Sequence, residues 1–132
     1  MTQRAVIVAT GKLGASGAAG PAGAAGAAGD WSTAQTINTQ TGTTYTLVTG
    51  DAGKLVTCSN ASAITVTVGT SLDLTTGQRI DLAALGAGQV TVAAGGATLN
   101  GTPGLKLRAQ YSTATLICIG TDSYLLMGDL VA

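Results

Sequence analysis

Apolar and polar residues alternate in short segments along the chain after residue 43. In the segment 63–68, Ile64, Val66 and Val68 fall on one face and two threonines fall on the other. A period of two is typical of β-strands with one buried face. We expect strands at Thr44–Thr49, Lys54–Ser59, Ala63–Val68, Gln78–Leu82, Gln89–Ala93, Thr98–Leu99, Leu105–Leu107, Ala114–Ile119 and Tyr124–Met127.

Turn residues separate these segments, among them GDAG at 50–53, GAG at 86–88 and GG at 95–96. Strands at intervals of roughly ten residues are typical of a sandwich or a jelly roll. The chain has no glutamate and few lysines, whereas threonine and valine are frequent, so the composition favours strands over surface helices. We therefore predict an all-β head over residues 31–132, with a β-sandwich or jelly-roll-like arrangement.

Two expected strands are apolar on both faces: ATLICI at 114–119 and YLLM at 124–127. In so small a domain, a strand buried on both faces suggests that one face meets another subunit. A core strand within a single sandwich is the alternative interpretation.

Ahead of the head, glycine occupies every third position, and no glycine is out of phase: Gly11, Gly14, Gly17, Gly20, Gly23, Gly26 and Gly29. Only glycine fits at the axis of a collagen triple helix, in which three chains wind together. We predict a collagen-like stalk over residues 11–30, about 55–60 Å long, and hence a homotrimer. Pro21 is the only proline of the run, so the head must help to hold the chains in register. A flexible Gly/Ala linker or a packed glycine-rich helix is the alternative.

Residues 1–10 form a short arm that contains a basic residue and an apolar run: Arg4, Ala5, Val6, Ile7 and Val8. Such a segment can add a strand to a partner's exposed sheet edge, and three copies would provide avidity. A frayed terminus is the alternative. Trp31 directly follows the stalk, and we expect it to plug the stalk–head junction. The apolar run is too short for a signal-peptide core or a membrane span, so we expect no membrane partner.

Charge and residue content exclude several function classes. Charged residues make up 9% of the chain and the net charge is zero, so no basic patch points to nucleic acid. Histidine is absent, which removes histidine-based nucleophiles and zinc sites. The six acidic residues are scattered aspartates, consistent with solvated or turn-capping positions. We expect no enzymatic activity, no metal and no cofactor.

Cys58 and Cys118 each lie within an apolar strand pattern. This placement favours free, buried thiols that behave as small apolar side chains. A disulfide between them is the alternative, which the sequence alone does not decide.

From Tyr45 onward the head resembles a domain of bacteriophage head fibres, capsid decorations and minor tail or tail-fibre proteins. The resemblance covers nearly the whole head and lies in YTLVTGDAGKLVTCSNASAITVTV (45–68), GAGQVTVAAGGATLNG (86–101) and LKLRAQYSTATLICIGTDSYLLMGDL (105–130). Its more specific part is GQVTVAAG followed by KLRAQYSTATLI, whereas single pieces such as DAGK are weak. Related domains often carry tryptophan where this chain has Tyr124, a difference in packing more than in role.

The resemblance implies a trimeric virion surface protein without catalytic activity. We expect a capsid decoration or head fibre, made in the host cytoplasm and anchored on the major capsid protein by the arm. A minor tail or tail-fibre protein that binds host-surface glycan is the alternative, although aromatic residues that could contact sugar are few: Trp31, Tyr45, Tyr111 and Tyr124. A secreted bacterial collagen-like protein is a third reading, against which the lack of a signal peptide argues.

Overall fold

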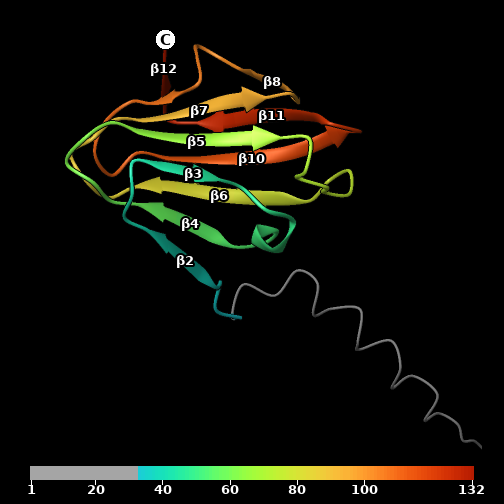
Figure 1. The fold of residues 1–132 in the computed structure, drawn as a ribbon, viewed down its shortest axis with the longest axis horizontal. Helices are drawn as coiled ribbons and strands as arrows, with labels where there is room; N and C mark the ends of the chain where they lie inside the picture. Colours follow the sequence, from blue (N-terminus) through green and yellow to red (C-terminus); the bar gives the residue numbers. More distant parts are fainter. Residues whose placement is uncertain (1–32) are drawn as a thin grey trace, which may run out of the picture. The chain divides into compact units, whose positions relative to one another are not determined.

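The computed structural model describes residues 33–132, and these residues contain β-strands and no α-helix. Eleven strands form a six-stranded and a five-stranded sheet that pack face to face around one apolar core (Figure 1). The all-β prediction is therefore confirmed. The arm, the collagen-like stalk and Trp31 lie in residues 1–32, outside the described residues, and what the sequence predicts for them stays a prediction.

The first six strands form three stacked rungs. Each rung places one strand in the six-stranded sheet and the next in the five-stranded sheet: β2 (Ile37–Gln40) and β3 (Thr44–Thr46), β4 (Leu55–Cys58) and β5 (Ile64–Gly69), β6 (Arg79–Ala84) and β7 (Val90–Gly95). Neighbouring rungs pair in parallel in both sheets. This winding is that of a β-solenoid, so the expected sandwich or jelly-roll arrangement is wrong for this half of the head.

The last five strands close the stack: β8 (Thr98–Gly101), β9 (Lys106–Leu107), β10 (Thr113–Gly120), β11 (Ser123–Gly128) and β12 (Leu130–Val131). Strand β10 runs antiparallel to both β6 and β11, and β9 runs antiparallel to both β7 and β12. The six-stranded order is β2-β4-β6-β10-β11-β8, and the other order is β12-β9-β7-β5-β3. Figure 1 shows β2 and β12 at opposite edges of the head.

The rungs also stack at their corners through backbone hydrogen bonds. The Ser59 amide donates to the Gln40 carbonyl over 3.0 Å, and the Gly88 amide donates to the Asn60 carbonyl over 2.8 Å. A Cβ atom at Gly88 would overlap the Ser62 carbonyl, because the two corners are in direct backbone contact. Glycine is therefore required at this corner for the third rung to lie on the second.

Because side chains alternate along a strand, every second residue of each strand points between the two sheets. All nine expected strands overlap an observed one, with ends that differ by at most three residues. Strands β2 and β12 were not expected, and part of the GDAG turn forms a 3-10 helix, η2 (Thr49–Asp51). Cys58 and Cys118 are free and buried in the core, as the favoured interpretation predicted.

Candidate interaction surfaces

The predicted site residues do not fall in the part of the chain that the structure describes. Arg4, Ala5, Val6, Ile7 and Val8 of the arm, Gly11 to Gly29 of the stalk and the junction residue Trp31 all lie outside residues 33–132. The surfaces that follow belong to the head.

The outward side of the six-stranded sheet carries a group of large apolar side chains among threonines and two charged residues, Arg79 and Asp81. Pairing aligns one row of outward residues across five strands: Ile37, Leu55, Asp81, Thr115 and Met127. A second outward row contains Ile117 beside Leu125. Ile119 continues the outward positions of β10, and its side chain is 51% exposed. We call Ile37, Leu55, Ile117, Ile119, Leu125 and Met127 the apolar face.

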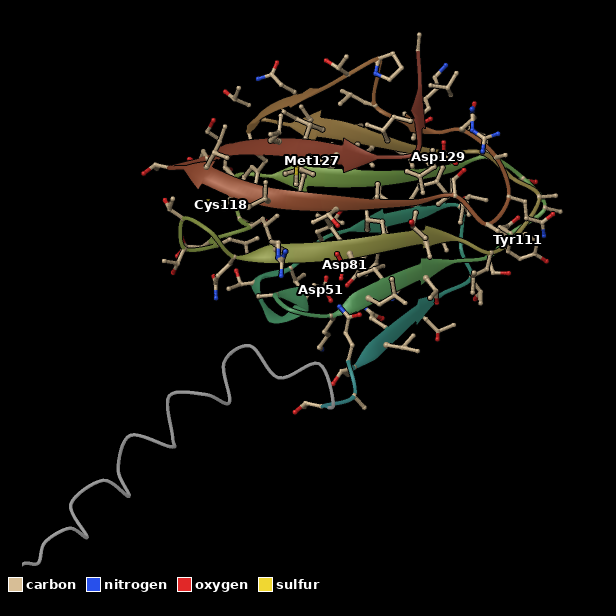
Figure 2. All side chains as sticks on the ribbon, turned by 180° about the vertical axis from the view of Figure 1, so that it is seen from behind. Asp51, Asp81, Tyr111, Cys118, Met127 and Asp129 are labelled. Carbon is tan, nitrogen blue, oxygen red and sulfur yellow. The ribbon has the colours of Figure 1, made fainter. Side chains whose placement is uncertain are left out.

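Exposure on the apolar face is greatest near its edge. Ile37, on the edge strand β2, is 58% exposed and Met127 is 43% exposed. Figure 2 looks onto this sheet, with Met127 and Asp81 both labelled over its strands. A depression of about 280 Å³ lies between Met127 and Leu55 and is floored by the β6 and β10 backbones. The sequence signal was present, because ATLICI and YLLM are apolar at both inward and outward positions.

The outward side of the five-stranded sheet has a different chemistry. Thr44 pairs with Thr65, Thr65 with Thr91, and Thr91 with Lys106. A parallel row continues with Thr46, Thr67 and Ala93. We call Thr44, Thr46, Thr65, Thr67 and Thr91 the threonine face. The two outer sides of one small head thus differ in their large aliphatic side chains, which lie among threonines on the six-stranded sheet and are few on the threonine face.

Asp81 is the acid within the apolar face, and its carboxylate has partners on both sides. The Thr115 hydroxyl donates to one oxygen over 2.7 Å, and the Gln35 amide donates to the other over 2.8 Å. A carboxylate with two donors loses less on desolvation than one without partners. The acid is therefore compatible with a covered surface.

A buried polar cluster joins the two sheets at the first rung. The carboxylate of Asp51 is 1% exposed and accepts hydrogen bonds from the Asn38 amide (2.9 Å), the Tyr45 hydroxyl (2.8 Å) and the Val48 backbone N–H (3.0 Å). Burial and, second, the hydrogen bond to Asp51 raise the pKa of Tyr45. The sequence predicts solvated or turn-capping aspartates, and Asp51 does accept a hydrogen bond from the backbone of its own turn, at Val48, but it is buried instead of solvated. Turn chemistry gave no signal of its burial.

Tyr111 stands at the opposite end of the sheet from the start of β2. Its backbone N–H donates to the carbonyl of Ala84, the last residue of β6, and β6 runs parallel to β4 and hence to β2. The side chain is 71% exposed and the backbone φ is 71°, a region that bulky residues rarely adopt. Figure 2 shows Tyr111 at the far end from Cys118. An exposed aromatic ring in this conformation is a candidate contact for a partner.

The loop that carries Tyr111 is fixed to the C-terminal strands. Arg108 forms a two-pronged ion pair with Asp129, with both nitrogen–oxygen distances at 2.8 Å. The Ser112 hydroxyl also donates to Asp129, over 2.6 Å. The Arg108 hydrogen bond and, second, the Ser112 hydrogen bond lower the pKa of Asp129. Tyr111 is thus presented from a well-bonded loop.

Residues 33–132 carry neither a metal cluster nor a membrane-spanning helix. Within this range no three residues among histidine, cysteine and the acids gather as a metal site would require. The described elements also include no helix of the length and hydropathy that a membrane span needs.

A second depression, of about 270 Å³, lies between the loops 72–76 and 120–122 and is mainly polar, with threonines and aspartates in its lining.

Comparisons with known proteins add no identification to this geometry. The resemblance to bacteriophage virion domains rests on the segments quoted from the sequence, and it stays a prediction. The structure by itself assigns a class of fold and leaves the family open. No protein-family model, no curated protein and no solved structure matched this chain.

Proposed function

We propose that the protein is a non-enzymatic structural protein of a bacteriophage virion, a trimeric capsid decoration or head fibre. The observation that carries this proposal is the in-phase glycine repeat of residues 11–29, placed directly before an all-β head. A collagen-like stalk serves to hold three chains together and to carry a head away from its point of attachment. The resemblance of the head to phage virion domains supports the same conclusion.

In this proposal each part of the chain has a mechanical role. The arm, residues 1–10, adds a strand to a sheet edge of the major capsid protein, and three arms on one trimer bind with avidity. The stalk spaces the head from the shell, and Trp31 fills the junction. The head lies on the capsid exterior, where it presents a surface and catalyses no reaction.

Electron cryo-microscopy of intact virions, with an antibody to the head as a label, tests the proposal. We expect label on the capsid, and we expect a chain without residues 1–10 to form trimers that no longer join particles. Removal of residues 1–10 followed by normal incorporation would eliminate the arm as the anchor. Label confined to the tail would contradict the capsid location.

Tyr111 favours one alternative function, a minor tail or tail-fibre protein whose head binds host-surface glycan. Its exposed ring lies at the end of the sheet opposite the start of β2, next to the half-exposed Leu85. Aromatic faces stack on the apolar faces of sugars. A glycan array with the unmodified chain and with Tyr111→Ala tests this alternative, which predicts binding that the substitution removes. If the unmodified chain binds no glycan, the glycan-binding alternative is excluded and the capsid decoration remains the proposed function.

A further inference from the structure

The two outer sides of the head differ in a way that points to a covered surface. At corresponding outward positions, the five-stranded sheet carries Thr65 and Thr67, whereas the six-stranded sheet carries Leu55, Ile117 and Met127. Contiguous exposed apolar patches on small proteins mark interaction sites. An apolar composition that includes methionine is typical of the core of a protein–protein interface.

We propose that the apolar face packs against copies of this same chain, with three such faces turned toward a common threefold axis. This inference rests on the three-chain assembly that forms part of the proposed function. It adds to that function the surface through which the heads associate, and it leaves the threonine face on the outside of the assembly.

The position of the glycine repeat relative to the apolar face identifies the occupant. A collagen-like repeat requires three chains in contact along its length. Its last glycine, Gly29, precedes Ile37 by eight residues, and eight residues reach at most about 29 Å. Ile37 belongs to the edge strand β2 and to the apolar face itself. Three apolar faces are therefore tethered close to one axis, where short linkers create effective concentrations of about a millimolar.

The polar groups on the sheet are compatible with this burial. Asp81 has hydrogen-bond donors from Thr115 and Gln35. Arg79 lies beside Ile117 in the second row, and its side chain is exposed, so its apolar stem can lie along the sheet while the guanidinium extends to water. When three identical faces meet around an axis, the carboxylate that each face presents to its neighbour is Asp81, which already has hydrogen-bond partners. The six-stranded sheet can thus be covered without a new buried and unsatisfied charge.

Thiol protection in the full chain tests this inference. The variant Met127→Cys places a thiol on the apolar face, and the matched control Thr65→Cys places one on the threonine face. Ile37→Cys places a thiol at a second position on the apolar face. Because the Ile37 side chain is exposed, this substitution should leave the folding of the head unchanged. The native Cys58 and Cys118 are buried, so the unmodified chain gives the background reaction with a maleimide. The mass of each variant is measured by light scattering in the same sample.

We expect a mass of roughly 38 kDa, three times 12.8 kDa, and a thiol at position 127 or 37 that reacts about tenfold more slowly than the one at position 65, as a contact of about 1.4 kcal/mol would produce. Equal rates at the trimer mass would overturn the inference and leave the proposed function standing. Protection at the monomer mass would mean that a segment of the same chain covers the face, which also overturns it. A monomer with equal rates would remove both this interface and the three-chain assembly.

Discussion

The hydroxyl of Tyr45 donates a 2.8 Å hydrogen bond to the carboxylate of Asp51, deep in the first rung. Tyr45 belongs to β3 of the five-stranded sheet, and Asn38, which donates to the same carboxylate, belongs to β2 of the six-stranded sheet. The acid thus ties together the edge strands of both sheets.

Asp51→Ala should lower the free energy of unfolding of the head by about 2–3 kcal/mol, because it leaves the partly buried Asn38 and Tyr45 groups without their acceptor. Chemical denaturation monitored by circular dichroism measures this loss. Asp73→Ala is the matched control, since Asp73 is an exposed aspartate in a loop, and it should change stability little. Equal effects of the two substitutions would show that the cluster does not stabilise the first rung.

The Arg108–Asp129 pair predicts an acid-dependent contribution to stability. The folded state lowers the pKa of Asp129 from 3.8, with Arg108 as the main cause. A lowered folded pKa stabilises the protein above the unfolded value, and this contribution is lost as the pH falls through the folded value. Asp129→Asn should therefore melt below the unmodified chain at pH 7, and the gap should narrow at pH values below 3.8. A gap independent of pH would contradict the assignment.

Gly88→Ala should destabilise the head by about 1–3 kcal/mol. The added methyl group would overlap the Ser62 carbonyl, and the stacked backbones of the second and third corners would have to separate. Gly50→Ala is the control, because no atom lies within 4 Å of its added Cβ. Thermal unfolding of both variants provides the measurement. A Gly88→Ala chain as stable as the control would mean that the corners are not in close contact.

Gly20→Val should disrupt the predicted triple helix locally and leave the head folded, because a side chain does not fit at the axis. Circular dichroism separates the two effects, since a triple helix and a β-rich head have different spectra. Ala19→Val adds the same side chain at a position outside the glycine register, so it should have a smaller effect. If the two variants have the same spectrum as the unmodified chain, the run is a linker.

The period-two pattern located most strands because each sheet has one buried face. The segment 63–68 was read from its alternation, and β5 spans Ile64–Gly69. The alternation does not predict β2, because its inward residues are the polar Asn38 and Gln40, and Asn38 hydrogen-bonds to Asp51 instead of entering the apolar core. The parallel winding was also hidden, since alternation records which face is buried and carries no information about strand direction. Rung stacking depends on long-range backbone contacts that no local pattern encodes.

The candidate surfaces were less accessible from the sequence than the strands. The segments ATLICI and YLLM, which are apolar at outward as well as inward positions, predict part of the apolar face. Its extension to Ile37 and Leu55 depends on the order of strands, which brings residues 37 and 127 into one row. The role of Tyr111 follows from a backbone φ of 71° and from exposure, neither of which composition records.

The threonine face has a consequence for how this protein behaves in different solutions. Only 9% of the residues are charged, so hydroxyl groups supply much of the contact between the five-stranded sheet and water. Threonine hydroxyls do not titrate, and salt does not screen the hydrogen bonds that they form with water as it screens charge–charge forces. The hydration of this surface is therefore nearly constant across changes in pH and ionic strength that would alter the colloidal behaviour of a charged one.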